Sequence, residues 1–386
     1  MTMRIIFLKI HLYLGLCAAI FLVILGVTGS ITAFEESAEL WLNGRLHYVP
    51  AAGKPLSEGE LIEKVNRAIA PAEVVFAKRF QDPTRSHIML TIEPNVTLSA
   101  SEASSANWRN WVARGNGRAA VFVNPSDASL LGRYTAVPAN QKILSKIHQF
   151  HMRLAPDPRS WGTFGKIGRE VVDYSGLILC FLVPTGVVLW WRTKRGRIKW
   201  SGQWFRVFFD VHNVAGIYAA VFLFIAAVTG VVASFDSVNK AIFRVTGSTQ
   251  VWHSGGPDSV PVVGAVPIST DQAIGIARQQ LPEAEVDGVV LPRAPKQSFI
   301  VLMRVPEEVT DSVHSSVVVD QYSGKPLQVL NFKTDSFAYR VMRFNRAIHT
   351  GDIFGMPSRI VASVSSLLLV VMAITGVVIW WRKLAV

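Results

Sequence analysis

Two histidines of this 386-residue chain lie in long apolar stretches and share one sequence context. His11 and His212 are each followed, at identical offsets, by a glycine, a Thr-Gly pair and a Phe-acid pair. An ionisable residue inside a stretch long enough to cross a bilayer marks a candidate functional site. Neutral imidazole costs far less to bury than a fixed charge, and it is a common axial ligand of haem iron. The matched positions therefore favour cofactor ligation over a polar contact between two helices.

Three more histidines lie shortly before the other two apolar stretches. His349 precedes the last stretch, and His148 and His151 precede the second. One histidine pair near each membrane face would hold two b-type haems through bis-histidine ligation, which suits electron transfer. His11 and His212 would bind one haem iron, and His349 with either His148 or His151 would bind the other. His148 and His151 are three residues apart, so both could approach one site on a helix.

Glycines and arginines near these histidines suit the same cofactor. Gly15 and Gly216 share a helical face with His11 and His212, where a missing side chain would admit a flat macrocycle. Ordinary helix packing is the alternative reading of such glycines. Arginines 343 and 346 precede His349 and could hold haem propionates or form a basic rim. The remaining histidines are expected at the surface (His47, His87, His253 and His314), and Glu35 and Asp236 are expected as solvated helix ends.

Four apolar stretches are long enough to cross a bilayer, which needs about 20 residues. They lie at roughly 7–34, 168–191, 208–235 and 358–381. The second and fourth share the ending Thr-Gly-Val-Val-x-Trp-Trp-Arg, as the first and third share the histidine pattern, so the sequence predicts a tandem repeat. The first stretch has a long core and no good small-x-small cleavage site before Glu35, which predicts an uncleaved anchor.

Short basic segments predict the orientation in the membrane. The 193–207 connection has several lysines and arginines and no acid, so it is expected in the cytoplasm together with both termini. The formal net charge of +12 is explained by this loop, the tails and anionic lipid headgroups, and nucleic-acid binding is not expected. Cys17 and Cys180 both lie in the apolar stretches, so no disulfide or cysteine-ligated metal is expected elsewhere. The predicted location is a bacterial inner membrane, with the lipid bilayer as a partner.

The two long segments between the apolar stretches carry helix and strand patterns. Residues 270–281 have helical spacing with an N-cap at Ser269 or Thr270, and alternating runs follow that predict a small antiparallel sheet. The first segment repeats this pattern, with a helix ending at Ile69, strands after it and an irregular Ser/Ala-rich insertion at 99–107. Both segments are expected on the periplasmic side.

The predicted fold is therefore an α-helical membrane protein with four transmembrane helices from a tandem repeat and two periplasmic α+β domains. Its expected parts are transmembrane helix 1 (1–35), periplasmic domain 1 (36–165), transmembrane helix 2 (166–192), the cytoplasmic loop (193–207), transmembrane helix 3 (208–236), periplasmic domain 2 (237–356), and transmembrane helix 4 with the tail (357–386).

The motif Val317-Val-Val-Asp320-Gln-Tyr-Ser-Gly324-Lys-Pro-Leu resembles the PepSY domain, and residues 121–131 look like a degenerate copy with Ala128 in place of the glycine. Together with the histidine-bearing helices and their Thr-Gly endings, the whole chain resembles the PepSY-associated transmembrane family. It is most similar to the inner-membrane siderophore reductases of the ferrioxamine type. The context Phe150-His151-Met-Arg-Leu resembles the family's usual ligand, which implies His151 rather than His148.

The resemblance implies a haem-dependent oxidoreductase that reduces ferric siderophore in the periplasm and releases Fe(II). The sequence has no Gly-rich dinucleotide fingerprint, so the electrons are expected from a separate donor, either a cytoplasmic reductase or membrane quinol. One alternative is a non-catalytic membrane protein that binds or regulates periplasmic partners. Another is an iron or haem transporter, although the apolar stretches lack a mid-span acid.

Overall fold

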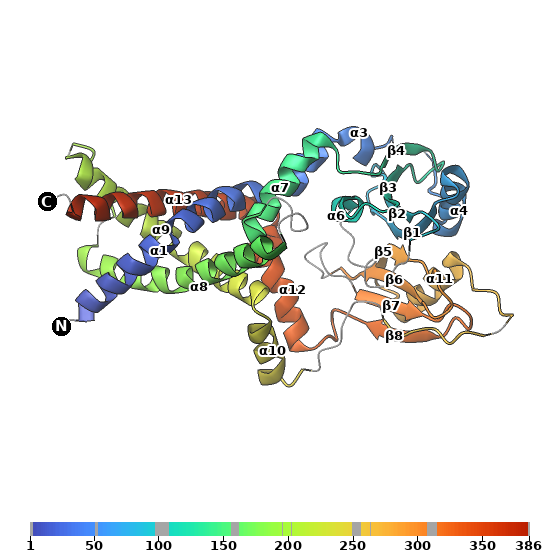
Figure 1. The fold of residues 1–386 in the computed structure, drawn as a ribbon. Coiled ribbons are helices and arrows are strands. Elements are labelled where there is room, and N and C mark those ends of the chain that lie inside the picture. The colour runs from blue at the N-terminus through green and yellow to red at the C-terminus, as the bar shows by residue number, and fades with distance from the viewer. Residues whose placement is uncertain are drawn as a thin grey trace. The chain divides into compact units, whose positions relative to one another are not determined.

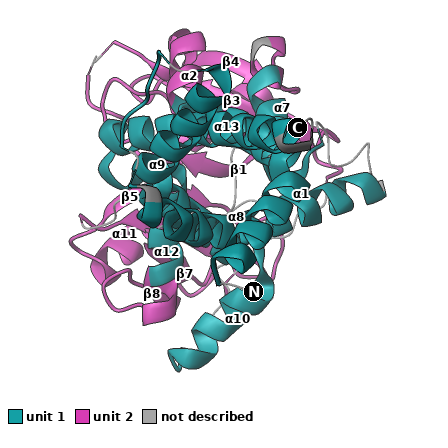
Figure 2. Ribbon diagram, turned by 90° about the vertical axis from the view of Figure 1, so that its left-hand side faces the viewer, with its two compact units in different colours: residues 1–36, 143–248, 341–386 teal, residues 37–142, 249–340 magenta. Residues whose placement is uncertain are grey.

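The computed structural model forms two compact units. It describes residues 3–50, 53–96, 108–155, 162–194, 196–201, 203–248, 256–262, 264–306 and 315–384. Figure 2 colours the two units, each of which is built from separate stretches of chain. We call residues 1–36, 143–248 and 341–386 the helical unit, and residues 37–142 and 249–340 the sheet unit. The predicted insertion at 99–107 lies outside the described residues.

Four long helices build the helical unit (Figure 1): α1 (Met3–Thr32), α8 (Gly162–Thr193), α9 (Trp204–Ser234) and α13 (Met356–Leu384). All four are long and apolar enough to cross a membrane, which confirms the four predicted spans. Helix α1 packs against α8 and α13, and α9 packs against the same two helices. Small and branched residues such as Ala18, Leu22, Ala219 and Leu223 fill the centre of the bundle.

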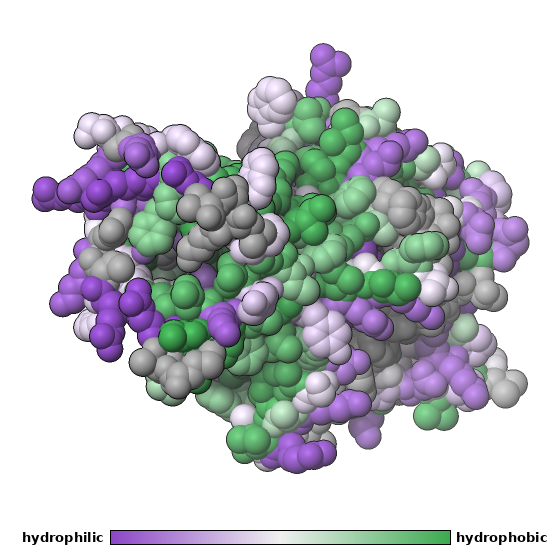
Figure 3. Space-filling view, turned by 60° about the vertical axis from the view of Figure 1, so that its left-hand side comes forward, coloured by the Kyte–Doolittle hydropathy of each residue, from purple (hydrophilic) through white to green (hydrophobic). Residues whose placement is uncertain are grey.

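The outer surface of these helices is strongly apolar. Ile20, Val221 and Phe181 are each more than half exposed although they lie in the middle of their helices. Figure 3 shows hydrophobic side chains over much of the face that it draws. Such a surface is unfavourable in water and favourable in a bilayer. Shorter helices also belong wholly or largely to the helical unit: α7 (Ala139–Arg153), α10 (Asp236–Val245), α12 (Phe337–Thr350) and η1 (Asp352–Phe354). Helix α2 (Glu35–Leu42) begins in the helical unit and continues into the sheet unit.

The sheet unit contains one antiparallel sheet with the strand order β4-β3-β2-β1-β5-β6-β7-β8. Its strands are β1 (Glu73–Lys78), β2 (His87–Ile92), β3 (Arg118–Val123), β4 (Leu130–Tyr134), β5 (Glu285–Val290), β6 (Phe299–Arg304), β7 (Ser315–Val319) and β8 (Pro326–Leu330). The segments on either side of the middle spans thus contribute four strands each to one sheet. They meet where β1 pairs with β5, and the buried carboxylate of Asp287 there accepts from Lys78 and Arg304.

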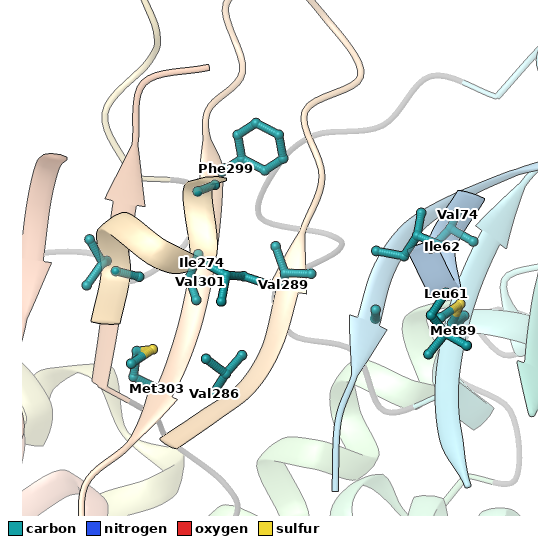
Figure 4. Packing of buried hydrophobic residues seen from close by; sticks show 14 of the residues in the cluster. Leu61, Ile62, Val74, Met89, Ile274, Val286, Val289, Phe299, Val301 and Met303 are labelled. Atoms are coloured by element: carbon teal, nitrogen blue, oxygen red, sulfur yellow. The ribbon is translucent and has the colours of Figure 1, made fainter. Parts of the chain in front are cut away.

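Helices cover the sheet. Helices α4 (Glu58–Ile69) and α11 (Thr270–Gln280) bury one set of side chains, and α6 (Trp108–Ala113) packs against the other, together with short helix α3 (Gly44–His47) beside β4. In Figure 4, Leu61 of α4 lies beside Met89 of β2, and Ile274 of α11 beside Val301 of β6. Full burial of such a side chain contributes about 1.5–3 kcal/mol. Ser269 forms a capping box at the start of α11, which settles the predicted N-cap.

Two histidines that were predicted at the surface are buried. His47 is 3% exposed and His87 is 4% exposed, so the surface prediction was wrong for both. Every side chain of β2 is buried because the sheet is covered on both faces. His87 lies 3.7 Å from the buried carboxylate of Glu58, and His47 lies 3.4 Å from that of Glu39. His253 and His314, which carried the same prediction, lie outside the described residues.

The stability of the sheet unit should depend on pH through His87. Burial, with Arg79 nearby, lowers the pKa of His87 to about 4 from its usual 6.5. Below pH 6.5 the unfolded chain therefore binds a proton that the folded chain does not accept until about pH 4, and stability falls with acidification. Burial raises the pKa of Glu58, which favours the folded state in acid and so opposes this effect.

We expect His87→Gln to remove the histidine contribution. Between pH 6.5 and 4 the unmodified protein should lose about 3 kcal/mol more free energy of unfolding than the variant, because Glu58 acts in both. Thermal unfolding of the full-length protein in detergent, followed by near-ultraviolet circular dichroism across this pH range, measures the difference. Parallel pH profiles for the two proteins would contradict the assignment.

Candidate functional site

Four histidines of the helical unit form two pairs, and the two rings of each pair lie close together. His11 of α1 and His212 of α9 have ring centroids 6.3 Å apart, and their ring planes are inclined by 87°. His151 of α7 and His349 of α12 have centroids 6.5 Å apart, with an inclination of 42°. Two imidazoles on opposite sides of one metal ion, each bound at about 2.0–2.1 Å, would place their ring centroids about 6.4 Å apart. The centroid spacing of both pairs is compatible with that arrangement.

A threonine holds each of these four rings. The Nδ1 atoms lie 2.9–3.0 Å from threonine Oγ1 atoms, in the pairs His11–Thr185, His151–Thr28, His212–Thr375 and His349–Thr229. Each threonine hydroxyl also donates, at 2.7 Å, to the carbonyl four residues earlier on its own helix. Since the hydroxyl proton is used in that bond, the oxygen accepts a hydrogen bond from the imidazole Nδ1–H.

Backbone carbonyls support the same protonation state. His212 Nδ1 lies 3.1 Å from the carbonyl oxygen of Met372, and His349 Nδ1 lies 3.1 Å from that of Ala226. A carbonyl can only accept, so Nδ1 carries the proton in both rings. Each Nε2 then keeps its lone pair, which is the form of neutral imidazole that binds a metal. Among the described residues, no group hydrogen-bonds to Nε2 of these four histidines.

Glycines of the same Thr-Gly pairs leave room for the rings. A Cβ atom on Gly29 would lie 3.1 Å from Cε1 of His151, and one on Gly230 would lie 3.2 Å from Cε1 of His349. A Cβ atom on Gly186 would lie 3.1 Å from Cε1 of His11, and one on Gly376 would lie 3.4 Å from Cε1 of His212. Threonine and glycine thus act together, because one anchors the imidazole and the other admits it. The sequence shows Thr-Gly in all four spans, but its link to the histidines appears only in the structure.

The threonine bonds and the histidine pairs connect different parts of the chain. The 193–207 connection divides the chain into a first half, with α1, α7 and α8, and a second half, with α9, α12 and α13. Each threonine bond joins two helices of the same half, such as α1 with α8 or α9 with α12. Each histidine pair takes one ring from the first half and one from the second. Neither half therefore contains a complete site.

His151, and not His148, lies opposite His349. The Nδ1 of His148 lies 2.6 Å from a carboxylate oxygen of Glu35, and its Nε2 lies 3.1 Å from Sδ of Met152. The side chain of His148 is 42% exposed, whereas that of Glu35 is only 16% exposed. Glu35 is thus bound to a neighbouring helix, and the expectation of a solvated helix end was wrong for it.

The remaining predicted residues lie around the pairs. A Cβ on Gly15 would meet Leu182 at 3.7 Å, and one on Gly216 would meet the methyl group of Met372 at 3.4 Å, so apolar side chains are the nearest neighbours of both glycines. Arg343 of α12 is buried and Arg346 is exposed. The described residues contain no cluster of three or more His, Cys, Asp or Glu side chains that could hold a bare metal ion.

The short helices that carry the second pair are fixed to the bundle. Asn345 of α12 donates at 2.9 Å to the carbonyl oxygen of Thr229 on α9. Gly168 of α8 lies so close to α7 that a Cβ there would overlap the carbonyl oxygen of Arg153. These contacts hold α7 and α12 against the long helices, so that His151 and His349 lie next to their threonines.

The protein is a membrane protein with four apolar helices and an antiparallel sheet that helices cover. Two pairs of histidines lie close together in its helical unit. The chain matches the family described as the PepSY-associated TM region over residues 8–383, and it belongs to that family. Among curated proteins, none matches the chain.

Replacing a threonine anchor should loosen one histidine. We expect Thr229→Val to remove the main acceptor of His349 Nδ1 and to weaken ligand binding at that pair by about 10–100-fold. Thr229→Ser keeps the hydroxyl and should retain binding. The measurement is haem affinity and stoichiometry of the purified protein, together with its thermal unfolding.

Thr246 offers a matched control, because its hydroxyl makes the same bond to the carbonyl four residues earlier and is hydrogen-bonded to none of the histidines that the structure describes. Thr246→Val should leave ligand binding unchanged. Equal ligand affinity for Thr229→Val and the unmodified protein would show that the threonine bond does not support the histidine.

Proposed function

We propose that this protein is an inner-membrane oxidoreductase that carries electrons across the bilayer and reduces ferric siderophore on the periplasmic side, releasing Fe(II). The observation that carries the proposal is the pair of facing imidazoles at each of two positions, each with its Nδ1 bound to a threonine hydroxyl. The proposed orientation places the 193–207 loop and both termini in the cytoplasm.

The two pairs fit bis-histidine haem. The centroid spacings suit two imidazoles on one iron, and the Thr-Gly glycines make room for each imidazole. His11 and His212 would hold one haem b, and His151 and His349 would hold the other. When bound, such a group would supply one-electron chemistry.

The protein's own residues prepare these positions. The threonine hydroxyls fix the ring orientation and the tautomer, and a hydrogen-bonded Nδ1–H makes the opposite nitrogen a better donor to a metal. Neutral rings avoid the cost of a fixed charge in the bilayer. The apolar side chains between α1, α8, α9 and α13 exclude water from the centre of the bundle.

The proposed reaction needs one electron for each iron. Fe(III) becomes Fe(II), and hard oxygen ligands hold the ferrous ion less strongly, so the siderophore releases it. The donor is either membrane quinol, which gives two electrons and two protons, or a separate cytoplasmic reductase. The resemblance to siderophore reductases supports the choice of substrate, and the facing histidines support the electron-transfer class.

The visible spectrum of the purified protein tests the cofactor. We expect a b-type spectrum after dithionite reduction and about two haems per chain. His212→Ala and His349→Ala should each remove one haem, because each takes one ligand from a different pair. His148→Ala is the matched control and should retain both haems. A colourless protein after haem-replete expression would instead favour a non-catalytic binding role.

Anaerobic oxidation of the reduced protein tests the substrate. We expect ferric ferrioxamine to reoxidise the dithionite-reduced, desalted protein, with one Fe(II) trapped by a ferrous chelator for each electron lost. His349→Ala should slow this step strongly, since it removes a ligand of the pair nearest the proposed periplasmic end. If the reduced haem spectrum persists in excess ferric ferrioxamine, this siderophore class is not the substrate.

A further inference from the structure

Helix α10 begins where the apolar helix α9 ends. Phe235 separates the two helices, and its ring packs edge-on against Tyr174 of α8 with a centroid distance of 5.9 Å. Figure 1 shows α10 turning away from the axis of the bundle, and Figure 2 shows it projecting from the bundle. Both helices belong to the helical unit. Because α9 is long enough to cross a bilayer, its end lies at a membrane surface, and α10 starts there.

The ten residues of α10 have two distinct faces. Val238, Ala241, Ile242 and Val245 follow the i, i+3, i+4, i+7 spacing and form one apolar stripe. Lys240 and Arg244 lie on the opposite side and are both exposed. Asp236 begins the helix, where a negative charge complements the helix dipole.

The protein leaves much of the apolar stripe uncovered. Val245 is 86% exposed, Ala241 is also exposed, and Val238 and Ile242 are only partly covered. By contrast, Phe243 departs from the stripe and is buried at 7% exposure. Helix α10 is therefore attached through one side while its stripe points away from the packed residues.

We propose that α10 is an interfacial helix that binds the phospholipid bilayer at the leaflet where α9 ends. The apolar stripe enters the boundary of the acyl chains, and Lys240 and Arg244 extend toward the headgroup phosphates. Two observations select lipid as the occupant. The continuity with α9 sets the helix at the depth of the headgroups, and its two basic residues complement anionic phosphate.

Collision measurements on spin labels test this placement. The full-length protein, in a Cys17→Ser, Cys180→Ser background, would carry a nitroxide at Val245→Cys or, as the matched control on the opposite face, at Lys240→Cys. Both would be placed in nanodiscs of phosphatidylethanolamine and phosphatidylglycerol. We expect the label at 245 to collide several-fold more with oxygen than with a water-soluble nickel chelate, and the label at 240 to show the reverse preference.

Two outcomes would overturn the proposal. Equal access of the nickel chelate to both labels would show that the stripe faces water. Protection of the label at 245 from both reagents would show that protein, such as a second copy of the chain, covers the stripe. Neither outcome depends on haem binding, so this test is independent of the proposed electron transfer.

Discussion

The hydrogen bond from imidazole Nδ1 to a threonine hydroxyl is the constraint on which the helical unit depends. A threonine on an apolar helix already donates its proton to the preceding turn, so its oxygen can only accept. This fixes the histidine tautomer without introducing a charge into the bilayer. The neighbouring glycine is required by the same contact, because a side chain there would meet the ring. The Thr-Gly pair thus both holds the imidazole and admits it.

The pairing of halves follows from this constraint. Each threonine bond ties the two helices of one half together, and each histidine ring then lies beside a ring from the other half. The sheet unit also joins the two halves, since each half supplies four strands and the two sets pair between β1 and β5. There the buried Asp287 accepts from a lysine of one half and an arginine of the other. Both units therefore require the whole chain.

The sequence was informative where periodicity or composition carries the signal. Apolar length identified the four spans, and the repeated context of His11 and His212 predicted that they would meet. Burial in the sheet unit was harder to predict, since strands covered on both faces lose the alternation that marks an exposed side, as His87 in β2 shows. The edge strands β4 and β8 escaped prediction because they are short and half exposed. Helical spacing alone left His148 and His151 open, and the family resemblance favoured His151. The structure shows that His148 contacts Glu35 instead.

The two halves of the chain share the geometry of some turns and differ in the helices that follow the first and third spans. Ala128 and Gly324 occupy equivalent turns, four residues after Asn124 and Asp320, and both have positive φ, at 66° and 71°. A positive φ costs an L-residue roughly 1–2 kcal/mol, yet alanine persists in a turn whose backbone and Asn124 side chain are hydrogen bonded. After the first and third spans the chains diverge further, because α2 is acidic and α10 is a basic amphipathic helix. The turns and the threonine-held histidines keep one geometry in both halves. For the histidines, a change in either partner would leave a buried polar group without its bond.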